Sequence, residues 1–362
     1  MKRMRNALYA IAFLSMFVVD AAMGAQPGAW KADWDKTVEA AKKEGQLVIY
    51  GSPDFEGLFG ELHKKYPEIK ITGVFNRGAD VAKRLMAERR GEKYLADLYV
   101  NGMTTGYNVF YKAKVLDPIP PLLVLPEVTN VSKWWRGKLH YVDPENQYLL
   151  NINGENRMVV AFNTKLVNPA EIKSYWDLLN PKWKGKLLLP DVRTMGDSFW
   201  AMTSARLNLG DDIIKKLFVD QEPALSRDTR QIAEFMVRGR YPIALGVNPL
   251  LLSQFQRQGL GKNLKTFHFP EMDTFNSSSS TLWLVNRAPH PNAAKLFANW
   301  LLTKDAQIVW GREVETNSRR IGVEPGNPLY AVPRGAKLLQ VDAEENLPEV
   351  VKTQDIAKAV IK

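Results

Sequence analysis

The chain has 362 residues, of which 45% are hydrophobic and 24% are charged, and these proportions are ordinary for a globular protein. It contains 0 cysteines, which excludes disulfides, thiolate metal sites, cysteine nucleophiles and any lipid anchor that needs a cysteine after a signal peptide. The formal net charge of +10 favours anionic ligands, but without long Lys/Arg blocks or nucleic-acid motifs we expect no nucleic-acid partner.

The first segment predicts the compartment. Basic residues, an apolar run over residues 7–19 and small residues follow one another, in the order typical of a secretory signal peptide. The flanking residues are Lys2, Arg3 and Arg5 on one side, and Ala21, Ala22, Gly24 and Ala25 on the other. The apolar run is shorter than the ~20 residues of a spanning helix, and a buried helix is the alternative. We expect residues 1–25 to be removed on export to the periplasm.

The next part of the chain alternates helix and strand patterns. We predict helices over 32–43, 55–65, 80–90 and 106–113, and strands over 46–50, 69–75 and 96–100. Gly45 ends the first helix, as a glycine just past a helix often does. This rhythm predicts a parallel sheet covered by helices on both faces.

The remainder is also of the α/β type after a proline-rich loop over 118–126. Strands are predicted over 157–162, 185–189, 241–247, 266–269 and 281–285, with a helical turn over 176–179. Helices are predicted over 197–209, 211–219, 228–237, 291–302 and 305–312. From Gly322 onward the chain is rich in Pro and Gly, and no internal repeat has a fixed period.

Several runs of sequence together resemble the type II periplasmic binding proteins of ABC importers. They include AAKKEGQLVIYGS, RMVVAFNTKLV, SYWDLLNPKWKGKLLLPD and APHPNAAKLFANWLLTKDAQIVW, and they extend over nearly the whole chain. The branch that the sequence most resembles contains binders of ferric iron, thiamine, phosphonates and hexose phosphates. The order and spacing of the runs carry the resemblance more than any one of them.

The resemblance implies two α/β lobes joined by two crossover strands, near 159–163 and 280–285. It assigns 26–158 plus 286–362 to the first lobe, and 159–285, with the crossover strands, to the second. The lobes would close on a solute by a hinge motion. A monomer of this kind has no cofactor and delivers its solute to a transmembrane permease with its ATPase.

Ligands of open α/β sheets bind beyond the carboxyl ends of the strands. In the first lobe this rule and the resemblance select Ser52, Asp54, Arg77, Gly78, Asn101 and Thr104. In the second lobe they select Thr194, Gly196, Arg227, Asp228 and Asn248, with Arg193 beside them. Small polar residues ahead of a helix expose backbone N–H groups that suit an anion. As alternatives, Asp228 caps a helix and the arginines are solvated surface charges.

The solute class rests on one departure from the family pattern. Ferric binders of this branch carry an adjacent tyrosine pair after the strand that corresponds to 241–247, where this chain has Asn248 and Pro249. We therefore expect no metal and an organic anion: a phosphonate, a sugar phosphate or a carboxylate. Ferric iron is the alternative solute, and a periplasmic sensor or chemoreceptor is the alternative partner.

The sequence lacks the common catalytic motifs that would indicate an enzyme. It has 4 histidines but no HExxH, no GxSxG and no GxxxxGK[ST], the motifs of zinc proteases, serine hydrolases and P-loop ATPases. Asp197 and Ser198 follow Gly196 in an esterase-like GDS triplet, but they lie in mid-chain at a predicted helix start. We expect a binding protein, with a degraded transferase on the same fold as the remaining alternative.

Overall fold

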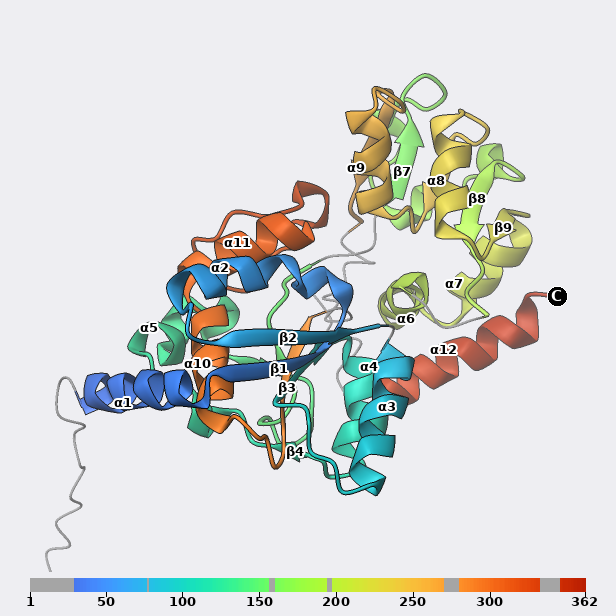
Figure 1. Ribbon diagram of the computed structural model, residues 1–362. Helices are drawn as coiled ribbons and strands as arrows, with labels where there is room; N and C mark the ends of the chain where they lie inside the picture. Colours follow the sequence, from blue (N-terminus) through green and yellow to red (C-terminus); the bar gives the residue numbers. More distant parts are fainter. Residues whose placement is uncertain (1–28, 77, 156–159, 194–196, 270–279, 333–345) are drawn as a thin grey trace, which may run out of the picture.

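The computed structural model describes residues 29–76, 78–155, 160–193, 197–269, 280–332 and 346–362, and Figure 1 shows them as two lobes. Each lobe has its own β-sheet flanked by helices, which confirms the predicted two-lobed α/β class. The predicted signal peptide, residues 1–25, lies outside these ranges. No helix within them is long and apolar enough to cross a membrane.

The first lobe is built on a 7-stranded sheet of order β2-β1-β3-β12-β6-β5, with β4 paired to β12. The strands are β1 (Gln46–Gly51), β2 (Lys70–Phe75), β3 (Leu98–Asn101), β4 (Leu116–Asp117), β5 (His140–Tyr141), β6 (Leu150–Asn151) and β12 (Thr281–Val285). β1 runs parallel to β2 and β3, as predicted, whereas β12 runs antiparallel to β3. The three 2-residue strands escape prediction because two residues show no periodicity.

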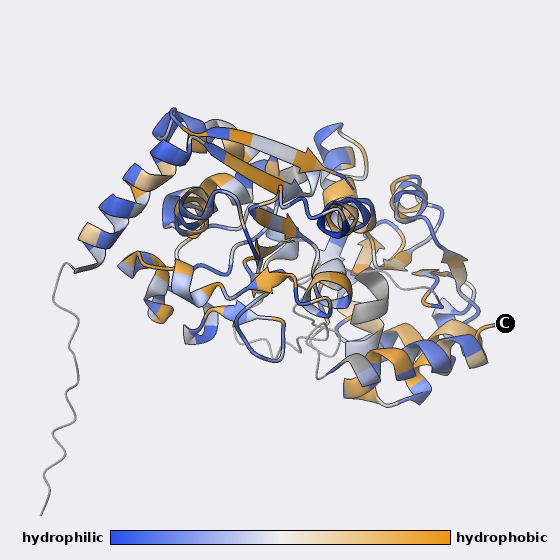
Figure 2. Cartoon of the chain, turned by 60° about the horizontal axis from the view of Figure 1, so that its bottom comes forward, coloured by the Kyte–Doolittle hydropathy of each residue, from blue (hydrophilic) through white to orange (hydrophobic). Residues whose placement is uncertain are grey.

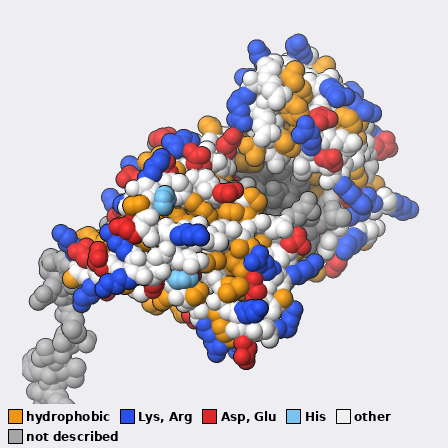
Figure 3. Space-filling model, viewed as in Figure 1, with side chains coloured by type: hydrophobic (Ala, Val, Ile, Leu, Met, Phe, Trp, Pro, Cys, Tyr) orange, Lys and Arg blue, Asp and Glu red, His pale blue; other side chains and the backbone are white. Residues whose placement is uncertain are grey.

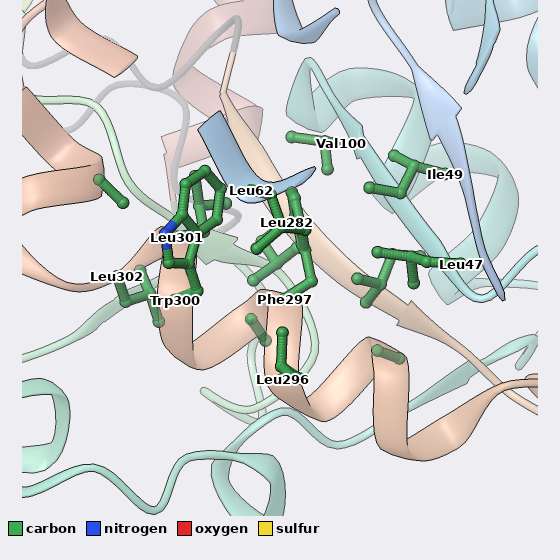
Figure 4. Packing of buried hydrophobic residues seen from close by; sticks show 14 of the residues in the cluster. Leu47, Ile49, Leu62, Val100, Leu282, Leu296, Phe297, Trp300, Leu301 and Leu302 are labelled. Carbon is green, nitrogen blue, oxygen red and sulfur yellow. The ribbon is translucent and has the colours of Figure 1, made fainter. Parts of the chain in front are cut away.

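Helices cover both faces of this sheet. They are α1 (Ala29–Glu44), α2 (Gly57–Lys65), α3 (Gly78–Arg90), α5 (Pro126–Thr129), α10 (Pro291–Leu301) and α11 (Lys304–Val314). On one face, Leu47 and Ile49 of β1 pack with Phe297 of α10 (Figure 4). On the other, Val48 and Tyr50 of the same strand pack in a separate core. Because both sets of alternating side chains are buried, β1 reads as a continuous apolar run.

The predicted helix over 106–113 has a different form in the structure. A short α4 (Met103–Thr105) continues into a π-helical turn, η2 (Gly106–Tyr111). The indole of Trp283, stacked on Tyr99 with ring centroids 4.4 Å apart, lies directly against Gly106. A Cβ atom on Gly106 would lie 2.2 Å from that indole, so only glycine fits there.

The second lobe contains a 5-stranded sheet of order β11-β7-β10-β8-β9. Its strands are β7 (Val160–Asn163), β8 (Leu187–Pro190), β9 (Ala224–Ser226), β10 (Ile243–Leu245) and β11 (Leu264–Phe267). Its helices are α6 (Asp197–Leu209), α7 (Asp212–Lys215), which runs into the π-helical turn η9 (Lys216–Asp220), α8 (Thr229–Val237) and α9 (Pro249–Arg257). β8 runs parallel to β9 and β10, so the carboxyl ends of these strands lie at one edge.

The chain crosses between the lobes twice. It leaves the first sheet after β6 and enters the second at β7, and it returns between β11 and β12. Residues 156–159 and 270–279 of these crossings lie outside the described ranges. The second lobe is thus inserted between two strands that pair with each other in the first, β6 and β12.

Two segments lie elsewhere than in the expected division of the chain. Residues 281–285, expected in the second lobe, form β12 in the interior of the first-lobe sheet. We expected all of 286–362 in the first lobe, but α12 (Leu347–Val360) packs on α6 and α7 of the second. Val350, Ala357 and Ile361 join the second-lobe core because they form an apolar stripe with helical spacing. Figure 2 shows hydrophobic and hydrophilic residues alternating along this helix, beside the C-terminus.

Candidate functional site

The carboxyl ends of the parallel strands carry most of the predicted binding residues. β1, β2 and β3 end at Gly51, Phe75 and Asn101 in the first lobe, and β8 and β9 end at Pro190 and Ser226 in the second. Figure 3 shows the surface hollowed between the lobes. We therefore examine the site as two half-sites, one in each lobe.

The first-lobe half-site is centred on Asn101, the last residue of β3. Its Oδ1 atom accepts a hydrogen bond from the N–H of Gly102 at 2.7 Å, and its backbone oxygen accepts one from the Thr281 hydroxyl at 2.6 Å. Its Nδ2 atom is buried and makes no hydrogen bond of good geometry within the described part of the chain, although it lies within reach of the Tyr99 hydroxyl. A buried amide donor without a partner is costly, so this atom suits a bound acceptor.

Gly78 brings the first turn of α3 to the same place. A Cβ atom on Gly78 would lie 2.8 Å from the Thr105 hydroxyl and 3.6 Å from Asn101 Oδ1, so the three residues adjoin. The carbonyl of Gly78 accepts a hydrogen bond from the Tyr99 hydroxyl at 3.3 Å. α3 is 13 residues long, so its first turn presents partial positive charge, which Asp80 in that turn partly offsets.

The other predicted residues of this lobe are only partly placed. Ser52 is half-buried before the short 3₁₀ turn η1 (Pro53–Phe55), and its N–H donates to the carbonyl of Val100 at 3.1 Å. Arg77 lies outside the described ranges, as do the side chains of Asp54 and Thr104. Thr105, one residue beyond the predicted Thr104, is the residue that sequence reasoning missed here.

The second-lobe half-site is a cluster of two arginines on one buried carboxylate. Arg193 donates from Nε to Asp191 Oδ1 at 2.8 Å and from Nη2 to Asp191 Oδ2 at 2.9 Å. Arg227 donates from Nε to Asp191 Oδ2 at 2.8 Å. Hydrogen bonds from Arg193 first, and from Arg227 second, hold the pKa of the Asp191 carboxyl well below its usual value. The Asp191 carboxylate is therefore ionised, and it pairs with both arginines.

The two arginines differ in what they offer to a ligand. Arg193 is engaged through all three nitrogens, because its Nη1 atom also donates to the carbonyl of Lys362 at 3.1 Å. Arg227 is engaged through Nε, and its side chain is 66% exposed. The outer edge of Arg227 is thus the cationic surface that this cluster leaves exposed. Sequence reasoning selected both arginines but not Asp191, which decides between them.

Two further candidates act as helix caps. Asp228 accepts hydrogen bonds from the backbone N–H groups of Arg230 at 2.8 Å and Gln231 at 3.2 Å, at the start of α8. Asn248 accepts one from the N–H of Leu251 at 3.1 Å, at the start of α9. The capping alternative accounts for Asp228, whose carboxylate would also repel an anion. The predicted Thr194 and Gly196 lie outside the described ranges.

A buried polar cluster beside the first crossing was not predicted. Glu155 is fully buried and accepts hydrogen bonds from the Thr316 hydroxyl and from the N–H of Asn317, the latter at 3.2 Å. Arg319 donates from Nε to the carbonyl of Asn153 at 2.6 Å. These bonds fix the crossing to the segment that follows α11. The polar run from Thr316 to Arg320 was the available signal.

The described residues hold no group of three or more His, Cys, Asp or Glu side chains that could bind a metal. Asn248, near which the resemblance led us to expect a tyrosine pair in a ferric binder, caps α9. What the described half-sites offer is hydrogen-bond donors and one cationic edge, which suit an oxygen-rich anion.

Comparisons with known proteins agree with this architecture. The model of the bacterial extracellular solute-binding protein family matches residues 153–313. Iron-bound HitA from Pseudomonas aeruginosa is similar in structure, with a TM-score of 0.61 and 17% identity over 87% of this chain and 99% of that one.

Two further solved structures are similar. Trichodesmium IdiA (FutA) in complex with iron and citrate has a TM-score of 0.67 and 17% identity, over 86% of this chain and 99% of that one. The Bordetella ferric binding protein has a TM-score of 0.68 and 16% identity, over 87% and 98%. The resemblance to two-lobed periplasmic binding proteins is therefore confirmed at the level of the fold.

Proposed function

We propose that this protein is an exported solute-binding protein that captures a small organic anion between its lobes and passes it to a membrane importer. The observation that carries the proposal is Arg227, whose guanidinium is oriented by the ionised Asp191 and whose outer edge faces solvent. A phosphonate, a sugar phosphate or a carboxylate fits such an edge through two parallel hydrogen bonds.

The first lobe supplies the complementary donors. Asn101 Nδ2 and the N–H groups at the start of α3 would hold oxygen atoms of the same solute. Closure of the lobes would remove these bonds from water and strengthen them, since the local dielectric falls. Binding and release then require no covalent step, so no catalytic residue is needed.

Ferric iron is the second candidate, because several similar structures are described as ferric or iron-bound proteins. Fe(III) prefers anionic oxygen ligands, and Asn248 with Pro249 supplies none where the resemblance places the tyrosine pair. For this reason the organic anion is preferred, and iron becomes one arm of the test.

The test is a thermal-shift panel on the protein from residue 26 onward, stripped of ligand. The probes are 2-aminoethylphosphonate, glucose 6-phosphate, citrate and ferric citrate. A probe at 100 times its dissociation constant stabilises the folded state by about 2.7 kcal/mol. We expect one anion class to raise the melting temperature. Ferric citrate alone raising it would establish iron instead, and no response to any probe would overturn the proposal.

A matched pair of variants ties binding to the site. Arg227→Gln should lower the affinity for the bound anion about ten-fold or more, since a charged hydrogen bond is lost. Arg230→Gln is the control: Arg230 is a nearby exposed arginine, on α8, that pairs with Glu234 at 3.0 Å. Equal binding by both variants would remove Arg227 from the site.

A further inference from the structure

α12 is fastened to the second lobe by more than apolar packing. Arg206 of α6 is only 3% exposed, and it donates to the Thr353 hydroxyl at 2.8 Å and to the Glu349 carbonyl at 3.1 Å, both on α12. It also pairs with the carboxylates of Glu349 and of Asp211, the latter at 2.6 Å. Lys352 reaches the same Asp211 at 2.8 Å. This network fixes both the position and the rotation of α12.

The far end of α12 is directed at the arginine cluster. Gln354 donates from Nε2 to the backbone carbonyl of Arg193 at 3.2 Å. The side chain of Arg193 in turn donates to the carbonyl of Lys362 at 3.1 Å. Arg193 is therefore held through its backbone by α12 and through its side chain by Lys362, two residues beyond the end of α12. The apolar packing of Val350 and Ala357 is enough to hold α12 on the lobe, so the polar contacts with Arg193 are not needed for that purpose.

The contacts continue to the proposed solute arginine. Arg193 holds Asp191 with two parallel hydrogen bonds, at 2.8 and 2.9 Å, which fix the plane of that carboxylate. The same carboxylate receives Nε of Arg227 at 2.8 Å. A chain of direct contacts thus joins α12 to Arg193, Asp191 and the outer edge of Arg227.

From this chain we infer that α12 is a positioning element of the solute site, and that Gln354 and Arg193 are positioning residues for Arg227. The inference rests on the proposed function. Its physical content is preorganisation: a guanidinium whose partner carboxylate is clamped loses less freedom when it binds an anion. Releasing α12 from Arg193 therefore lowers the affinity for the anion, although no group that contacts the anion is removed.

Gln354→Ala is the first test because the residue is only half-buried and α12 keeps its apolar stripe. We expect the anion that stabilises the wild type most, among the panel above, to bind about five-fold more weakly, the effect of one lost hydrogen bond. Gln354→Lys keeps an N–H donor and should restore most of the affinity. Lys358→Ala, an exposed residue on the same helix, is the control and should bind as the wild type does.

Two readouts separate positioning from mere stability. A structural role would lower the melting temperature of the free protein and leave the anion-induced increment unchanged, whereas positioning reduces the increment. Hydrogen exchange over residues 187–193 needs no solute, and Gln354→Ala should accelerate it several-fold. If no probe binds the wild type, the proposed function fails, and hydrogen exchange alone then tests whether Gln354 holds Arg193 in place. Unchanged exchange, or an unchanged increment where a probe does bind, would overturn the inference.

Discussion

Replacing Arg206 by alanine should release α12 and destabilise the second lobe. The side chain is buried, and it makes two hydrogen bonds to neutral groups and two to carboxylates. The carboxylates of Asp211 and Glu349 are 48% and 41% exposed, so both regain water when the arginine is removed. The cost is therefore near the lower end of the range for breaking a buried ion pair, about 3 kcal/mol.

Urea denaturation followed by far-UV circular dichroism measures this loss as a fall in the transition midpoint. Arg312→Ala is the matched control, because that arginine is 65% exposed beside Glu313 and should cost less than about 0.5 kcal/mol. Thr353→Val tests the network, since its effect should be smaller when Arg206 is already alanine, leaving only the bond from the Thr353 hydroxyl to the Glu349 carbonyl. A loss under about 1 kcal/mol for Arg206→Ala would show that apolar packing alone holds α12.

Two further predictions concern the first lobe. Gly106→Ala should destabilise it by about 2 kcal/mol, because the new Cβ atom would lie 2.2 Å from the Trp283 indole; chemical denaturation measures this, and an unchanged midpoint would mean that the indole moves aside at little cost. Burial, followed by the charge of Arg319, lowers the pKa of His140 to about 3, so the unfolded chain takes up a proton near pH 6.5 before the folded one does. Folding stability should thus fall by about 2 kcal/mol between pH 7 and pH 5 from this residue alone. His140→Gln should flatten that slope, and an unaltered slope would contradict the assignment.

The sequence was sufficient for the repeating elements and insufficient for contacts between distant segments. The apolar run of β1 and the helix patterns on either side of it predicted the parallel sheet, because periodicity is a local property. Gly106, at the start of η2, lies directly against Trp283, which is far away in the chain, and the pattern over 106–113 does not predict that contact. α12 likewise has an apolar stripe, but a stripe does not say which lobe will cover it.

The same distinction holds for the site. The rule on strand ends selected Asn101, Gly78 and Arg227, because the carboxyl ends of strands can be located in a sequence. It could not separate Arg227 from Arg193, since the nitrogen atoms that each guanidinium leaves exposed depend on its hydrogen bonds to Asp191 and Lys362. Asp228 was selected for the same reason as the others, and its capping bonds became visible only in the structure.

The position of β12 has a consequence for how the molecule is made. This strand lies in the interior of the first sheet, between β3 and β6, and its residue Thr281 bonds to Asn101 across 180 positions of sequence. The strands of the second lobe, by contrast, all lie within residues 160–267 and pair only with one another. Long-range pairing delays folding because the loop must close first. The first lobe therefore completes its sheet only after every strand of the inserted lobe is available, and the inserted lobe in turn receives its last helix, α12, after β12.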